Sequence, residues 1–317
     1  MKFTKFTKSI AVFVMVLAAS MFLWMGSTPV KAGSLGYISS LSMTDTSKYS
    51  LTVSWTPAEN ATSYNVYYKE YASQEDYIFA GTTIATSHTI TGLNDGMKYE
   101  VKVCPVDATG EGYGKRVYDA FTLPDKLEGF KQKKWWYFIK QLEVEWEKQS
   151  GVDGFEVILY DNKNKKVSKK NLNSYYSSVS FSKMKDKVYT VKARSYKNYN
   201  GKKYYSSWSS ICCLNQARIT KATVSGNKLN VKWGKIAGAT KYEVYVSTKP
   251  KSGYKKVATV SKNKNSCTVK KLKGKKFSSK KTYYVYVKTV CNKGKSKNNS
   301  GALYYWNTKN TSWGYLN

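Results

Sequence analysis

Lysine is the side chain of this sequence with the clearest chemical role. An ammonium group is a compact, hydrated charge that attracts anions without the two-pronged geometry of arginine. The lysines are densest near residue 270, and we predict that a polyanion binds there in a salt-dependent, weakly selective way. The lysines assigned to this site are Lys255, Lys256, Lys270, Lys271, Lys273, Lys275, Lys276, Lys280 and Lys281.

The distribution of charge along the chain supports this prediction. The formal net charge is +33, from 53 basic and 20 acidic side chains. Residues 33–124 hold six basic and ten acidic side chains, residues 125–215 hold 19 and nine, and residues 216–317 hold 24 and one. Such an asymmetry indicates an anionic partner for the C-terminal part. The competing interpretation is a lysine-rich surface that serves solubility and has no specific ligand.

The first 32 residues are predicted to be a secretory signal peptide. Three lysines precede an uncharged, mostly apolar stretch from Ser9 to Val30, and small residues at Val30 and Ala32 suit a cleavage site. The mature chain would then be secreted, either released or retained at a cell wall, with no membrane span. The alternative is an uncleaved anchor, because a stretch of this length can cross a bilayer.

An extracellular location suggests the class of polyanion. Teichoic acids of a cell wall and acidic glycans are the natural candidates, and a host or other surface protein stays open as a further partner. Nucleic acid is a poorer candidate, because the lysine run has no interleaved aromatic side chains for base stacking. We therefore predict a secreted, non-catalytic adhesion or binding array whose C-terminal part holds an anionic polymer.

Trp135 and Trp136 suggest a second function. Adjacent residues on a strand point to opposite faces, so at most one of them can enter a core and the other is expected to be exposed. An exposed indole is a platform on which a sugar ring can stack. The alternative function is therefore a carbohydrate-binding accessory protein of an extracellular polysaccharide-degrading system.

The residues needed for catalysis are scarce. His88 is the only histidine, so a Ser-His-Asp or Cys-His arrangement has no other imidazole to serve as its base. The sequence has no paired C-x-x-C motif and neither common phosphate-binding glycine loop. Glu143, Glu145 and Glu147 alternate along one strand and are expected to face solvent. We predict no enzyme, no cofactor and no metal; an unrecognised hydrolase is the least favoured alternative.

The cysteines are odd in number, so they cannot all pair within one chain. Secretion permits disulfides, but their density here is low for a disulfide-stabilised scaffold. Cys267 with Cys291 is the one pair considered, and buried thiols are the favoured interpretation. The five are Cys104, Cys212, Cys213, Cys267 and Cys291.

The elements that must position these side chains come from an internal repeat. The pattern L-x-V-x-W occurs three times and ends at Trp55, Trp146 and Trp233. A second aromatic strand begins nine residues after each tryptophan, and a third match starts at Tyr99, Tyr189 and Tyr283. Strict alternation of apolar and polar residues predicts strands with one buried face. The spacing is typical of antiparallel β-sandwiches, so the predicted fold class is all-β.

At these residues the chain resembles the fibronectin type III family, as three tandem modules of a secreted bacterial surface protein. We name them module 1 (33–124), module 2 (125–215) and module 3 (216–317, with an aromatic C-terminal tail). The resemblance implies that the tryptophan lies on strand B and that the strand-F tyrosine forms a corner with the upstream backbone. Module 2 departs from the pattern with Phe155 on strand C, and module 3 has a longer stretch before Tyr283.

The repeated aromatic residues are expected to be core residues rather than ligand contacts. They are Trp55, Tyr99, Trp146, Tyr189, Trp233 and Tyr283. The segment around Trp208 is similar to the Ser-Trp-Ser element of some type III modules, in which tryptophan stacks on a strand-F cation. This resemblance implies a contact from Arg194 or Lys192.

Overall fold

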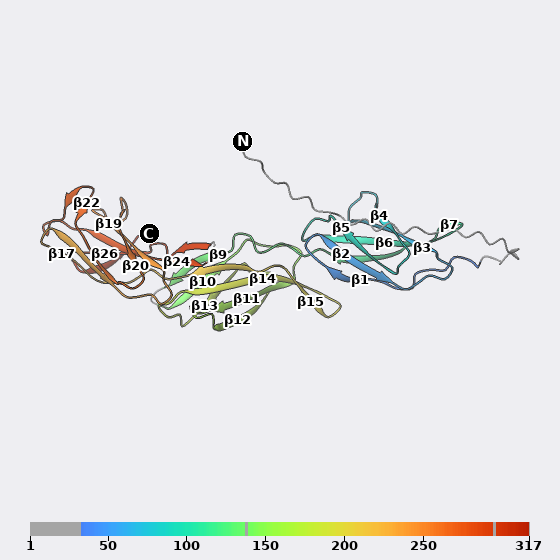
Figure 1. Ribbon diagram of the computed structural model, residues 1–317, viewed down its shortest axis with the longest axis horizontal. Helices are drawn as coiled ribbons and strands as arrows, with labels where there is room; N and C mark the ends of the chain where they lie inside the picture. Colours follow the sequence, from blue (N-terminus) through green and yellow to red (C-terminus); the bar gives the residue numbers. More distant parts are fainter. Residues whose placement is uncertain (1–32, 137–138, 294–295, 317) are drawn as a thin grey trace, which may run out of the picture. The chain divides into compact units, whose positions relative to one another are not determined.

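The computed structural model describes residues 33–136, 139–293 and 296–316, and in this part of the chain every regular element is a β-strand (Figure 1). The all-β prediction is therefore confirmed. The predicted signal peptide, residues 1–32, lies outside the described residues. No helix that could span a membrane occurs in the described ranges.

The strands of module 1 form two antiparallel sheets. The order is β1-β2-β5 in the first and β4-β3-β6-β7 in the second, with β8 also paired to β6. Those of the first sheet are β1 (Leu41–Thr46), β2 (Ser50–Trp55) and β5 (Ser87–Thr91). Those of the second are β3 (Ser63–Glu70), β4 (Ile78–Thr83), β6 (Lys98–Asp107), β7 (Gly110–Glu111) and β8 (Lys115–Phe121).

Module 2 repeats this plan. Its sheets have the orders β13-β10-β9 and β12-β11-β14-β15, and β16 also pairs with β14. The first contains β9 (Lys131–Trp136), β10 (Gln141–Glu145) and β13 (Ser178–Phe181). The second contains β11 (Gly154–Tyr160), β12 (Lys166–Asn173), β14 (Tyr189–Tyr199), β15 (Lys202–Tyr205) and β16 (Ser209–Cys213).

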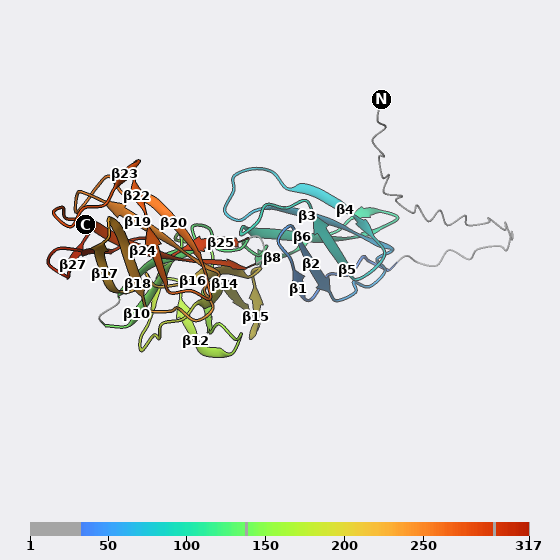
Figure 2. The same ribbon diagram turned by 60° about the vertical axis from the view of Figure 1, so that its left-hand side comes forward.

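Module 3 has the same two sheets. It adds one strand at the edge of the larger sheet and a separate small hairpin (Figure 2). The three-stranded sheet contains β17 (Ile219–Ser225), β18 (Lys228–Trp233) and β21 (Ser266–Val269). The larger sheet contains β19 (Lys241–Ser247), β20 (Lys255–Ser261), β24 (Tyr284–Lys293), β25 (Ser296–Asn299), β26 (Tyr304–Asn307) and β27 (Ser312–Tyr315). A separate hairpin is formed by β22 (Lys271–Leu272) and β23 (Lys275–Lys276).

The repeated tryptophans and tyrosines occupy three hydrophobic cores. Each tryptophan packs within 5.0–5.4 Å, between ring centroids, of the aromatic ring nine residues later: Tyr64, Phe155 or Tyr242. Trp233 is only 1% exposed, and the other five aromatic residues assigned to the core are also buried. Apolar side chains alternate with polar ones along β2, β10 and β18, because successive residues of a strand face opposite sides.

The strand-F tyrosines tie each module to its own upstream backbone. The Tyr99 hydroxyl accepts a hydrogen bond from the Asn94 amide at 2.9 Å. Tyr189 and Tyr283 make the same contact with the amides of Lys185 and Ser278, both at 3.1 Å. The tyrosine corner implied by the family resemblance is therefore present in all three modules.

Candidate anion-binding site

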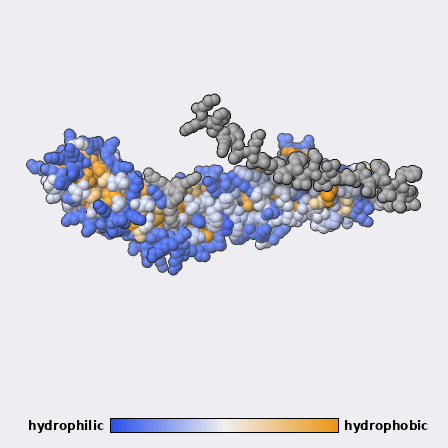
Figure 3. Space-filling model, in the orientation of Figure 1, coloured by the Kyte–Doolittle hydropathy of each residue, from blue (hydrophilic) through white to orange (hydrophobic). Residues whose placement is uncertain are grey.

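The densest part of the lysine run folds as the β22–β23 hairpin. Lys271 pairs with Lys276 and Leu272 with Lys275, and the turn consists of Lys273 and Gly274. Both turn residues have positive φ, 50° and 78°, as a two-residue hairpin turn of type I′ requires. Leu272 packs against the core of module 3, so the hairpin is anchored while its lysines stay exposed. In Figure 3, blue hydrophilic surface with orange hydrophobic patches covers the part of the molecule to which this hairpin belongs.

The hairpin borders a pocket of about 290 Å³. Four of the predicted lysines contribute to its lining, and other residues come from the end of β19 and the loop after it. The lining residues are Ser247, Thr248, Gly253, Leu272, Lys273, Lys275, Lys276, Lys281 and Tyr283. Four lysine residues in the lining of one small pocket give it a positive charge that would attract a multiply charged anion.

Hydrogen bonds order the uncharged side of this pocket. The Ser247 hydroxyl donates to the Ser252 carbonyl at 2.5 Å and accepts from the Lys249 amide at 2.9 Å. Tyr283 is held by the corner contact with Ser278. The pocket therefore combines hydrogen-bonded polar residues with long, exposed lysine side chains. The sequence offered no signal for Ser247 and Thr248, because they precede the hairpin by more than 20 residues.

The carboxylate of module 3 forms its contacts with residues outside the hairpin. Glu243 on β19 is the one acidic residue in the segment 216–317. It accepts a hydrogen bond from the Tyr245 hydroxyl at 3.0 Å and lies 3.5 Å from Lys256 and 3.9 Å from Lys241. Burial acts to raise the pKa of this carboxyl, but the hydrogen bond from Tyr245 and the charge of Lys256 outweigh it, so the pKa is lowered. The hairpin lysines gain no counterion from Glu243 in this arrangement.

The structure divides the nine predicted lysines into three groups. Lys273, Lys275, Lys276 and Lys281 surround the pocket. Lys270, Lys271 and Lys280 are exposed nearby in the sequence but do not line it. Lys255 and Lys256 lie on β20, where Lys256 is engaged with Glu243.

The two tryptophans proposed as a glycan platform have different environments. Trp135 is 3% exposed and packs 5.9 Å from the ring of Tyr189, so the platform prediction is wrong for this residue. Trp136 is 41% exposed. The ammonium of Lys134 lies 3.7 Å from the centre of the Trp136 indole and covers part of its surface.

Outside the lysine run, the side chains that commonly bind metals form no metal-binding cluster in the described ranges. No group of three His, Cys, Asp or Glu residues there is arranged to hold a metal ion. His88 lies half-buried on β5. Cys267 is a free thiol, so it does not pair with Cys291, and burial raises its pKa to about 11. Burial likewise raises the pKa of the Cys104 thiol to about 12, which disfavours the nucleophilic thiolate.

The comparison with protein families gives a match within module 1. Residues 36–118 match the fibronectin type III domain family, a span of fewer than half of the 317 residues. No curated protein matches the chain.

Three solved structures illustrate the likeness. A two-domain fibronectin type III segment of chicken tenascin has 15% identity and a TM-score of 0.35, over 56% of this chain and 99% of its own. The FN1–FN3 domains of chicken CNTN1 have 14% identity and a TM-score of 0.29, over 80% and 93%. An fn3 domain of human collagen alpha-1(XX) has 20% identity and a TM-score of 0.27, over 31% and 95%. The chain is an all-β protein of tandem fibronectin type III-like sandwiches, and residues 36–118 match the family itself.

Proposed function

We propose that this protein is a secreted, non-catalytic binding array whose module 3 holds an anionic cell-wall polymer, a teichoic acid or an acidic glycan. The observation that carries the proposal is the pocket beside the β22–β23 hairpin, whose lining includes Lys273, Lys275, Lys276 and Lys281. Among the described residues none of these lysines has an ion-pair partner. An external anion would therefore supply the missing negative charge without breaking an internal contact.

A retention assay on purified cell wall tests this function. The full chain is applied to intact wall and to wall stripped of teichoic acid, across a salt series. The variant Lys273→Glu, Lys275→Glu, Lys276→Glu is expected to bind at least about tenfold more weakly, because charge-assisted contacts are each worth about 1.5–3 kcal/mol. Retention should also fall with salt, because bound counterions are released when cations meet a polyanion.

The control must change the same charge at lysines outside the pocket. Lys235, Lys262 and Lys309 are exposed and belong to module 3, so Lys235→Glu, Lys262→Glu, Lys309→Glu matches the change in net charge. Retention of this control close to that of the parent supports a localised site. Equal losses in the two variants would show that diffuse charge, rather than the hairpin, holds the wall. Loss on stripped wall identifies teichoic acid, and undiminished binding there points to an acidic glycan.

The exposure of Trp136 supports a second candidate, the carbohydrate-binding accessory protein. Trp136→Ala should then abolish binding on a glycan array while leaving the salt-dependent wall retention unchanged. Unchanged glycan binding in this variant would exclude the second candidate.

A further inference from the structure

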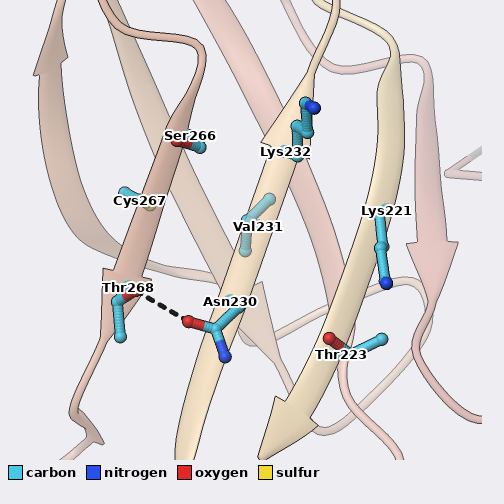
Figure 4. A pocket seen from close by; sticks show the side chains of 8 residues that line it. All are labelled: Lys221, Thr223, Asn230, Val231, Lys232, Ser266, Cys267 and Thr268. Atoms are coloured by element: carbon cyan, nitrogen blue, oxygen red, sulfur yellow. Dashed lines mark hydrogen bonds between the residues drawn. The ribbon is translucent and has the colours of Figure 1, made fainter.

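A second cationic surface lies on the outer face of the β17–β18–β21 sheet (Figure 4). It borders a shallow pocket of about 320 Å³, and none of the nine lysines of the predicted site lines this pocket. The side chains on this face are basic or carry hydroxyl and amide groups. The pocket is lined by Lys221, Thr223, Asn230, Val231, Lys232, Ser266, Cys267 and Thr268.

The register of the three strands brings two positive charges together. Lys221 on β17 lies directly opposite Lys232 on β18, and Lys232 lies opposite Ser266 on β21. Like charges directly opposite on neighbouring strands destabilise a sheet. Figure 4 shows the two ammonium groups turned toward opposite ends of the face, which leaves space between them. Neither lysine has an ion-pair partner within the described part of the chain.

Module 2 shows how the same position is neutralised within the protein. Trp146 and Trp233 are equivalent, so Glu145 on β10 corresponds to Lys232 on β18. Glu145 lies opposite Lys131 on β9 and opposite Ser178 on β13, and its carboxylate is 3.4 Å from the Lys131 ammonium. Module 2 therefore has the cross-strand row Lys131–Glu145–Ser178, and module 3 has Lys221–Lys232–Ser266 in its place.

Module 1 gives the uncharged form of this row. Ser54, which precedes Trp55, lies opposite Ser42 and Ser87. Across the three modules one row is neutral, one is internally paired and one carries two unbalanced charges. With a lysine at position 232, the sheet lacks the pair of opposite charges found in module 2. An anion bound from outside would supply the missing negative charge.

The uncharged groups on the face indicate what else the ligand contains. The Thr268 hydroxyl donates a hydrogen bond to the Asn230 carbonyl oxygen at 2.7 Å, so the amide nitrogen of Asn230 is directed away from β21 (Figure 4). This nitrogen and the hydroxyls of Thr223 and Ser266 offer hydrogen bonds to hydroxyl and phosphoryl oxygens. No aromatic side chain lines the pocket, so a sugar ring or a base would have no stacking surface.

We propose that this face is a second, independent site on module 3, and that it binds the phosphodiester group of a ring-free polyol phosphate chain. The two lysines flank the face, so each can pair with one singly charged phosphodiester of such a chain, and the neutral donors contact the hydroxyls between them. This site goes beyond the hairpin pocket of the proposed function and needs no lysine of that pocket.

The test uses the full chain and a short glycerol phosphate oligomer as the probe, with affinity measured by calorimetry. The parent for comparison is the hairpin variant Lys273→Glu, Lys275→Glu, Lys276→Glu, which isolates the sheet face. Adding Lys232→Glu recreates the Lys131–Glu145 pair of module 2 and should weaken binding about tenfold. Adding Lys309→Glu makes the same charge change at an exposed turn and should leave the affinity within about twofold.

Each outcome decides one of the two proposals. Equal effects of Lys232→Glu and Lys309→Glu would overturn the sheet-face site. Complete loss of binding in the hairpin variant would also overturn the sheet-face site, but it would be consistent with the hairpin site. Full binding in that parent, lost on adding Lys232→Glu, would support the sheet face and contradict the hairpin site.

Two further measurements test the chemical class of the ligand and the folding of the variant. In the first, an oligogalacturonate of equal charge replaces the glycerol phosphate oligomer. If Lys232→Glu weakens binding of the oligogalacturonate as much as binding of the glycerol phosphate oligomer, the assignment to a ring-free phosphodiester is overturned. Thermal unfolding of the Lys232→Glu variant should show a midpoint equal to or above that of the parent. If this variant unfolds instead, Lys232→Gln and Lys221→Gln are measured, and unchanged affinity in both would overturn the site.

Discussion

Arg194 on β14 lies directly opposite Glu156 on β11 and holds its buried carboxylate. The Arg194 Nε donates to Glu156 Oε2 at 2.7 Å, and a terminal guanidinium nitrogen lies 2.6 Å from the same oxygen. The guanidinium also lies 3.5 Å from the ring centre of Tyr205 and 4.2 Å from that of Trp208. The contact between Trp208 and a strand-F cation, implied by the family resemblance, is therefore confirmed with Arg194 as the cation.

Replacement of Glu156 by glutamine should destabilise module 2. The Glu156 side chain is only 4% exposed, and Lys169 contacts its other oxygen, so the variant leaves two cations without their shared anion. We expect a loss of about 2–3 kcal/mol in the free energy of unfolding, measured by urea denaturation. Glu145→Gln removes a more exposed ion pair and should cost less than about 1 kcal/mol. Similar costs for the two variants would contradict the role assigned to Glu156.

The same carboxylate should make module 2 sensitive to acid. Burial acts to raise the Glu156 pKa, but the hydrogen bonds from Lys169 and Arg194 outweigh it and the pKa in the folded state is lowered. A lowered pKa contributes stability that is fully present above the unfolded value of about 4.3, and that is lost as the pH falls through the folded value. Unfolding free energies of the wild type and Glu156→Gln should therefore converge below pH 4. A difference that stays constant as the pH falls further below that value would contradict the prediction.

The adjacent tryptophans of β9 should respond differently to alanine. Trp135→Ala removes a buried ring beside Tyr189 and should cost about 3–5 kcal/mol in unfolding free energy. Trp136→Ala removes a partly exposed ring and its contact with Lys134, with an expected cost of about 1 kcal/mol or less. Urea unfolding followed by tryptophan fluorescence gives both values. The reverse ranking would mean that β9 has the opposite orientation.

Loss of a tyrosine corner should have a modest, similar cost in every module. Phenylalanine at Tyr99, Tyr189 or Tyr283 keeps the buried ring but removes the hydroxyl that accepts an upstream amide hydrogen bond. We expect about 1 kcal/mol for each variant in chemical denaturation. No change in any of the three would show that water replaces the hydroxyl without loss.

The turn of the β22–β23 hairpin should depend on Gly274. A Cβ at this position would meet no atom within 4 Å, so the cost of Gly274→Ala comes from its φ of 78° alone. A left-handed conformation costs a residue with a Cβ about 1–2 kcal/mol, and strain in the turn should also weaken retention on cell wall. Gly234→Ala is the control, because Gly234 has an ordinary φ and its Cβ would lie 3.9 Å from the nearest atom. Equal retention of the two variants would mean that the hairpin geometry is unimportant for binding.

Local patterns in the sequence predicted the fold but only part of the site. The alternation around Trp55, Trp146 and Trp233 is enough to assign strands and a buried face, because side chains alternate along any strand. The lysines near residue 270 were identified by their density. The contributions of Ser247 and Thr248 were missed, because they join the pocket through the packing of two loops rather than through any local pattern.

The sequence by itself determined the class of structure, the core tryptophans and the excess of positive charge in module 3. The tertiary structure alone decided that Trp135 rather than Trp136 is buried, and that Lys221 and Lys232 are partners in the strand register. The physical reason is strand register. A shift of one residue moves every side chain of a strand to the other face, and register depends on turns and on the partner strand rather than on the strand's own pattern.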